Sequence, residues 1–228
     1  GLYGITAEML EEDPELVQFC TDLVHSAALV LDNGGLIKYD RKAGSFTPTE
    51  LGKVASAYYL SHTSMAVYNE NLRPSMSDIE LFSIFSMSSE FKFMAVREEE
   101  KLELARLLDK VPIPVREGVD DHLAKVNVLL QAYLSRLSLD GFALMADMVY
   151  VTQSAGRILT ALFQILLRRG WSQAALRALN LCKAVQHRMW SAQTPLRQFP
   201  EISPELIRRI ENKDLTWEQV RDLDEATL

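Results

Sequence analysis

One segment of this 228-residue chain carries side chains along a single line that could bind a nucleic-acid strand. Residues 144–166 contain no proline and repeat apolar residues at helical spacing, which predicts an α-helix. At roughly 100° per residue, one side of that helix carries a line of side chains, here called the polar stripe: Tyr150, Gln153, Ser154, Arg157 and Gln164. The small Ala161 is expected on the same line. A guanidinium suits phosphate, an aromatic ring suits a base or sugar, and hydroxyl and amide groups form hydrogen bonds, so the stripe predicts contact with a nucleic-acid strand.

The charge distribution favours the same segment. The net charge of the chain is −7, which argues against indiscriminate binding to nucleic acids. Residues 1–140 carry 13 basic and 22 acidic side chains, whereas residues 141–200 carry seven basic side chains and one acidic side chain, Asp147. The basic block therefore includes the polar stripe. Two of its members, Arg168 and Arg169, equally suit a helix C-terminus, where cations are favoured.

A structural interpretation of the polar stripe stands beside the binding one. Its side chains could pack against neighbouring helices of a bundle, and Arg157 could pair with an acid from residues 97–103. Helical spacing alone does not separate these two interpretations. The acidic run Glu98-Glu99-Glu100 is expected to be a solvated helix face or a contact with a basic neighbouring domain.

The sequence contains no arrangement of residues typical of an active site. It lacks the G-x-x-x-x-G-K-[ST] phosphate-binding loop, and its four histidines have no partner at metal-ligand spacing. Cys20 and Cys182 lie far apart, which suits a reducing compartment and predicts neither a disulfide framework nor a zinc site. We therefore expect no catalytic residue, metal or cofactor in this chain. No apolar run reaches about 18 residues, so no membrane span is expected.

The first part of the chain has the pattern of a partial winged helix. A helix capped by Asp13 with proline in its first turn is followed by short strands at 36–39 and 45–47 and by a helix from Thr49. Helix, two-stranded wing and helix form the back half of a winged helix. Its start is expected to lie before Gly1, which would leave apolar residues such as Leu23 and Val30 exposed where that start is not supplied.

The remainder is predicted to be helical. Helices are expected at 61–69, 77–83, 97–108, 125–136, 144–169 and 172–190, and a helix-loop-helix follows. Ser75 or Ser77 is expected to cap the second of these, Leu102 to point inward from the third, and Thr216 to cap the last helix of the chain. The predicted fold is mainly α, with three domains: the C-terminal part of a winged helix at 1–60, a helical bundle at 61–190 and the helix-loop-helix at 191–228.

Several segments carry a resemblance to a known family. They are residues 49–60, 96–104, 126–133, 144–166 and Pro195-Leu196-Arg197-Gln198-Phe199. In that order they resemble the exit from the winged helix, two parts of the helical bundle, the ratchet helix and the start of the helix-loop-helix of the large two-cassette spliceosomal RNA helicases. That family is Ski-two-like and unwinds the U4/U6 duplex. The resemblance covers nearly the whole chain and is closest to the first cassette.

The resemblance implies a role for the polar stripe. In that family the ratchet helix follows two motor domains and lines the channel by which one RNA strand leaves. Tyr150, Gln153, Ser154, Arg157 and Gln164 would then touch the single-stranded tail of a duplex, which is U4/U6 snRNA in that family, with Ser154 and Arg157 as the main contacts. Related DNA helicases have an arginine and an aromatic residue seven positions apart on this helix. Here Tyr150 and Arg157 keep the spacing but exchange the types, which leaves the stacking role of Tyr150 open.

The resemblance also implies what surrounds the chain. ATP and Mg²⁺ would bind in upstream motor domains, an immunoglobulin-like domain would follow, and spliceosomal proteins in the nucleus would be partners. Arg197 could reach RNA or a neighbouring domain, or it could bond backbone carbonyls at the end of the bundle. The alternative function is a protein-interaction scaffold with little RNA contact. Similar bundles occur in a translocon-associated protein and in the second cassette of these helicases, and the acidic residues 1–140 would suit a basic partner.

Overall fold

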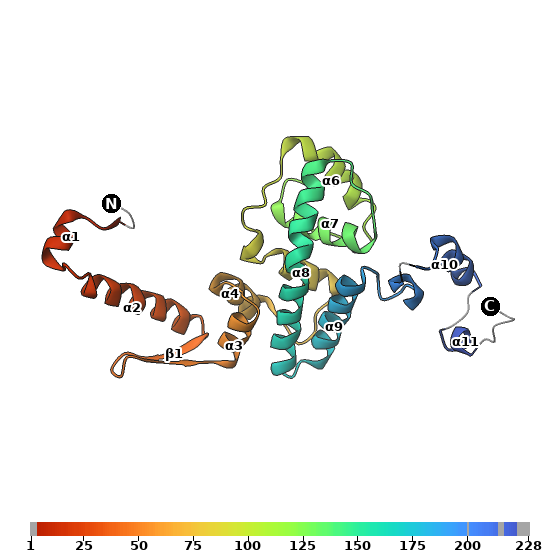
Figure 1. Ribbon diagram of the computed structural model, residues 1–228. Helices are drawn as coiled ribbons and strands as arrows, with labels where there is room; N and C mark the ends of the chain where they lie inside the picture. Colours follow the sequence, from red (N-terminus) through yellow and green to blue (C-terminus); the bar gives the residue numbers. More distant parts are fainter. Residues whose placement is uncertain (1–3, 200, 214–216, 223–228) are drawn as a thin grey trace. The chain divides into compact units, whose positions relative to one another are not determined.

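The computed structural model describes residues 4–199, 201–213 and 217–222, and its fold is mainly α, as the sequence predicts (Figure 1). The chain divides between Asn71 and Leu72 into two compact units. The first unit contains the predicted hairpin and the second contains the polar stripe. The predicted domain boundaries after residues 60 and 190 stay predictions. Within the described ranges, no helix combines the length and apolar character that crossing a membrane requires.

The first unit shows the predicted order of helix, hairpin and helix. Its elements are α1 (Ala7–Glu12), α2 (Val17–Asn33), β1 (Ile37–Asp40), β2 (Ser45–Pro48), α3 (Glu50–Ala57) and α4 (His62–Asn71). The two strands are antiparallel, and their register places Tyr39 opposite Phe46, with the two rings stacked 5.1 Å apart. Cross-strand aromatic pairs of this kind stabilise a short hairpin.

The start of α2 differs from the prediction. Asp13 is not the residue adjoining the helix: Leu16 precedes Val17 and has a φ of 54°, in the left-handed region. The Asp13 carboxylate nevertheless accepts the backbone N–H groups of Val17, Gln18 and Phe19 at 2.8–3.2 Å. Asp13 therefore accepts the unpaired N–H groups at the start of α2, although it lies four residues before Val17. The prediction of proline in the first turn of this helix is wrong, because Pro14 precedes the helix.

The second unit is built around two long helices. Its elements are α5 (Asp78–Ser86), η2 (Ser89–Phe91), η3 (Glu98–Glu100), α6 (Lys101–Leu108), α7 (His122–Leu134), α8 (Phe142–Arg168), α9 (Ser172–His187), η4 (Pro195–Gln198), α10 (Pro204–Glu211) and α11 (Trp217–Arg221). α8 packs along α9 and against α7 (Figure 1), and α5 packs against α7. Every side chain from Ala124 to Ala132 is buried, so α7 forms the centre of the unit.

Some predicted boundaries in this unit need correction. α5 extends to Ser86, and its cap is Ser77, whose hydroxyl and backbone form a reciprocal capping box with Glu80. The predicted helix 97–108 begins instead as the short η3. Leu102 is 67% exposed, so the prediction that it points inward is wrong. The buried residues of α6 are Leu104 and Leu107, and Leu102 lies off that line. The predicted cap Thr216 lies outside the described residues.

Candidate nucleic-acid interface

The polar stripe lies on α8, whose opposite face is fixed by burial. Val151, Ala155, Ile158, Leu162 and Ile165 are at most 2% exposed. This apolar line determines the rotation of the helix about its axis, because turning it would expose all five side chains to water. The predicted helix 144–169 is thus confirmed, although it starts at Phe142 and ends at Arg168, and the sides that carry the polar stripe are directed away from this core.

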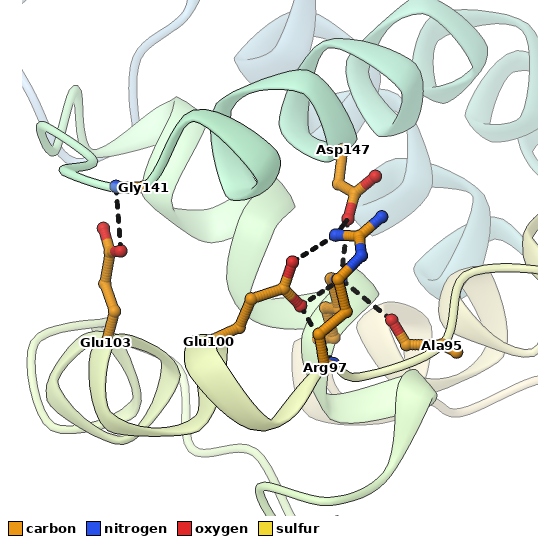
Figure 2. Close-up of polar contacts among 7 residues, drawn as sticks. Ala95, Arg97, Glu100, Glu103, Gly141 and Asp147 are labelled. Atoms are coloured by element: carbon orange, nitrogen blue, oxygen red, sulfur yellow. Dashed lines mark hydrogen bonds and ion pairs between the residues drawn. The ribbon is translucent and has the colours of Figure 1, made fainter.

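The start of α8 is held by an acid from another helix. The carboxylate of Glu103, on α6, accepts the backbone N–H group of Asp140 at 2.7 Å and that of Gly141 at 3.0 Å, the second of which Figure 2 shows. Helix N-termini carry unpaired N–H groups and favour negative charge, so this contact stabilises a helix start at which Gly141 provides no side-chain cap. The result is a helix start joined to the body of the bundle.

The members of the polar stripe differ in exposure along the helix. Tyr150 and Gln153 are exposed, and Ser154, Arg157 and Gln164 are partly exposed. Ala161, which the sequence places on the same line, is completely buried, and this part of the expectation is wrong. The reason is tertiary: α9 follows after a short turn and packs back along the second half of α8. The stripe is therefore broadest in the first half of α8.

Tyr150 is tied to the segment that precedes η3. Its hydroxyl donates to the backbone carbonyl of Glu90 at 2.9 Å, and its ring meets Phe91 edge to face at 6.3 Å. Phe91 is completely buried, whereas the Tyr150 side chain stays 49% exposed. The ring is thus held at one edge by the protein, and stacking of a base on it stays a prediction.

Four charged residues form an ion cluster beside the start of the stripe: Arg97, Glu100, Lys125 and Asp147. Figure 2 labels Arg97, Glu100 and Asp147. The Lys125 ammonium donates to Glu100 at 2.6 Å, to Asp147 at 2.6 Å and to the carbonyl of Ala95 at 2.9 Å. The same terminal nitrogen of Arg97 contacts Glu100 and, at 3.0 Å, Asp147. The cluster joins η3, α7 and α8, which come from three separate parts of the sequence.

Burial sets the electrostatics of the ion cluster. Glu100 is 3% exposed and the Lys125 side chain has no exposed surface. Burial by itself raises the pKa of Glu100, but hydrogen bonds from Lys125 and Arg97 outweigh it and hold that pKa below its ordinary value of 4.5. The same contacts to Glu100 and Asp147 raise the pKa of Arg97. Within the described residues, no buried side-chain nitrogen or oxygen lacks a hydrogen-bond partner.

Sequence reasoning missed this cluster. Glu100 was expected on a solvated face or against a neighbouring domain, and that expectation is wrong because its partner Lys125 is 25 residues away. One signal was present: Lys125 is a charged residue directly before the apolar run of its helix, and Asp147 is the only acid in residues 141–200. Periodicity gives the face on which each charge lies, but it does not give the pairing between helices.

Arg197 takes part in a structural contact. Its guanidinium makes two parallel hydrogen bonds to the Glu211 carboxylate, at 2.8 and 2.7 Å, which join η4 to α10. Its backbone carbonyl accepts from Arg136 at 2.8 Å. Arg197 thus has the predicted structural role, but its guanidinium donates to a carboxylate and not to the backbone carbonyls that were expected. A contact with RNA or a neighbouring domain stays a prediction.

The described residues contain no group of three or more histidine, cysteine or acidic side chains that could hold a metal ion. What the arrangement offers instead is a surface of hydrogen-bond donors. The stripe carries one guanidinium, one hydroxyl and two amides on a helix whose start is held by Glu103 and the ion cluster. Such a surface suits binding to an extended, negatively charged strand.

Comparisons with known proteins place the chain in a family. It is 56% identical over 227 residues to the DExH-box ATP-dependent RNA helicase DExH13 of Arabidopsis thaliana, which covers 100% of this chain and 10% of the relative. It is 55% identical over 98% of its length to the U5 small nuclear ribonucleoprotein 200 kDa helicase of Homo sapiens, and 55% identical over its whole length to the pre-mRNA-splicing factor brr2 of Schizosaccharomyces pombe, again 10% of each relative.

These similarities confirm the resemblance to spliceosomal RNA helicases that is visible in the sequence. The chain spans about 10% of the length of the curated relatives it matches. The family described as the Sec63 Brl domain matches residues 48–217. Because that match covers well over half of the chain, the chain belongs to the Sec63 Brl domain family.

Proposed function

We propose that this chain is an accessory, non-motor region of an ATP-dependent spliceosomal RNA helicase. In this proposal α8 guides and grips the single RNA strand while the U4/U6 duplex is unwound during pre-mRNA splicing in the nucleus. The observation that carries the proposal is the position of the polar stripe. Gln153, Ser154, Arg157 and Gln164 keep exposed surface along a helix whose other face is buried. The names of the relatives, which are helicases and splicing factors, support the part of the proposal that places the chain in a spliceosomal helicase.

The proposed mechanism is mechanical. Arg157 would contact phosphate, and Ser154, Gln153 and Gln164 would contact phosphate and sugar oxygens. Opening and closing of motor domains would move the RNA strand past these groups, and the bundle would keep the strand from escaping. Each contact must be weak, on the order of 1 kcal/mol as for an ordinary net hydrogen bond, because a tight hold would stall stepping.

The cofactors of such a helicase would bind elsewhere in it. The sequence lacks the phosphate-binding loop motif, and the described residues contain no group of three or more histidine, cysteine or acidic side chains that could hold a metal ion. Under this proposal ATP and Mg²⁺ belong to upstream motor domains. A downstream immunoglobulin-like domain and spliceosomal proteins would be the remaining neighbours. No step described for this chain passes through the nucleotide or the metal.

The experiment that tests the proposal replaces Arg157 by alanine in the parent helicase. ATP-dependent unwinding of an RNA duplex with a single-stranded tail is measured together with the melting temperature. We expect unwinding to be lost at an unchanged melting temperature. Unchanged unwinding would remove Arg157 from the mechanism. Loss of unwinding together with a large fall in melting temperature would mark Arg157 as structural. The variants Gln153→Ala and Ser154→Ala would then decide the role of the stripe.

A second candidate function is a protein-interaction scaffold, and exposed apolar side chains favour it. Phe142, Met145 and Val149 lie on one outward side of α8 and are 83%, 38% and 50% exposed. On α2, Leu23 and Val30 are about half exposed. Apolar residues at this spacing suit a protein partner more than an RNA strand. If the chain is a scaffold, the parent helicase should keep its unwinding activity in the Arg157→Ala variant. A variant with both Phe142→Ser and Val149→Ser should lose binding of the protein partner.

A further inference from the structure

A surface depression opens at the start of the polar stripe. It has a volume of about 250 Å³ and is lined by side chains that include Phe93, Arg97, Asp147 and Tyr150. Phe93 is 86% exposed. The Arg97 side chain is 45% exposed, although one of its terminal nitrogens is held by the ion cluster. The depression thus places an accessible guanidinium beside the first residue of the stripe.

The remaining donors of Arg97 are available. One terminal nitrogen makes both contacts, to Glu100 and to Asp147 (Figure 2). Among the residues that the structure describes, Nε and the second terminal nitrogen of Arg97 donate to no protein acceptor. A guanidinium presents its donors as a rigid fork that matches a phosphate group. Arg97 therefore combines a fixed position with unused N–H groups that can reach an outside ligand.

Charge compensation within the ion cluster lowers the repulsion that a phosphate would meet at this depression, which Glu90 also lines. The ion cluster contains two carboxylates, of which Asp147 is 19% exposed, and they are balanced by Lys125 and Arg97. Without Arg97 the cluster would carry an excess negative charge beside the stripe and would repel a strand. Because Glu100 and Asp147 already hold the Arg97 side chain, less conformational entropy is lost when it binds a ligand.

We infer that Arg97 is a further phosphate-binding residue, so that an RNA strand held by the polar stripe continues past Tyr150 to Arg97. Glu100 and Asp147 are then positioning residues for this guanidinium. The inference rests on the proposed function of the stripe and deepens it. The stripe from Gln164 to Tyr150 covers roughly 21 Å of helix axis, and Arg97 extends the path beyond its end.

The test measures the salt dependence of RNA binding, which a merely structural role does not change. Single-stranded RNA is titrated with the parent helicase carrying Arg97→Gln over a series of salt concentrations. We expect the affinity to fall roughly three- to tenfold at low salt. The slope of log K against log salt should shrink by about 0.7, the value for one phosphate contact with a single strand.

A matched control exists on α9. Arg177 is 50% exposed and pairs with Asp78 at 3.3 Å, so Arg177→Gln removes an arginine of similar exposure from outside the stripe. Its slope should stay that of the unaltered protein. Arg97→Lys keeps the charge but loses the fork, so it should keep the slope and lose part of the affinity. If Arg97→Gln lowers the melting temperature, the slope and affinity measured for Arg97→Lys test the inference in its place.

Three results would overturn the inference: an unchanged slope in Arg97→Gln, an equal change in Arg177→Gln, or a slope in Arg97→Lys reduced as far as in Arg97→Gln. Arg157→Gln, measured in the same series, separates this failure from failure of the proposed function. If Arg157→Gln reduces the slope and Arg97→Gln does not, only the role of Arg97 is wrong. If neither variant reduces the slope, RNA binding by the stripe is wrong as well.

Discussion

Lys125 is an ammonium group without exposed surface, and three protein acceptors replace the water it loses on folding. Two of those acceptors are the carboxylates of Glu100 and Asp147, which would otherwise be left with Arg97 alone. Buried ion pairs add little net stability when complete, because desolvation offsets the attraction, but removing one partner leaves a charge without compensation. The ion cluster is therefore sensitive to the loss of any one of its members.

Replacement of Lys125 by methionine should destabilise the second unit by about 3–5 kcal/mol, because Glu100 stays buried without its main cation. Chemical denaturation followed by circular dichroism measures this change. Lys101→Met is the control, since Lys101 pairs with the exposed carboxylates of Glu98 and Asp120 and should matter little. Equal midpoints for Lys125→Met and the unaltered protein would show that the cluster contributes nothing to stability.

The same cluster predicts a loss of stability in acid. The pKa of Glu100 is lowered by folding, so its contribution is fully present above its ordinary value of 4.5 and is lost as the pH falls through the lower folded value. The groups that face it are Lys125 and Arg97, with Asp147 sharing both cations. Urea midpoints from about pH 6 to about pH 3 should fall more steeply for the unaltered protein than for Glu100→Gln. Parallel curves would contradict the assignment.

At the scale of elements, two glycines show how local backbone contacts decide what a position tolerates. A Cβ atom at Gly52, on α3, would lie 1.9 Å from the carbonyl oxygen of Leu36, which directly precedes β1. A Cβ atom at Gly156, on the exposed side of α8, would have no atom within 4 Å. The first glycine is required by the close approach of α3 to the hairpin, whereas the second only adds flexibility to a helix.

Gly52→Ala should therefore destabilise the first unit by about 3 kcal/mol or more, the upper range for overpacking, because the backbone must move. Gly156→Ala should stabilise α8 by about 0.5–1 kcal/mol, since alanine restricts the unfolded chain and favours the helix. Melting temperatures of both variants, measured side by side, check the opposite signs. A Gly52→Ala protein as stable as the unaltered one would mean that α3 can shift away from Leu36 at no cost.

α8 and α9 show where one element limits what a neighbouring element can present. The line of the polar stripe is regular in sequence, but Ala161, which lies in the half of α8 along which α9 packs, is buried, whereas Tyr150 and Gln153 are exposed. The accessible part of the stripe therefore begins where Glu103 and the ion cluster hold the start of the helix. The exposed side chains of the stripe thus lie on the part of α8 that is held in place, and a surface that binds a strand requires both properties.

At the scale of the whole molecule, the sequence by itself determined the kind of structure. Apolar periodicity identified the long helix and its buried face, and turn residues identified the hairpin, because these signals are local and repeat every few residues. The charge count separated an acidic first part from a basic block that includes Arg157. The resemblance to spliceosomal RNA helicases was also visible in the sequence, and the comparisons confirm it.

Tertiary structure decided which side chains meet. Lys125 pairs with Glu100 and Asp147 across 25 and 22 positions, and the fork of Arg197 is occupied by Glu211. The same packing left the Arg97 side chain 45% exposed and buried Ala161. Helical spacing gives the angle of each side chain about its own axis, but the neighbour at that angle depends on how separate helices dock. That docking is set by burial over the whole unit, and no short segment contains it.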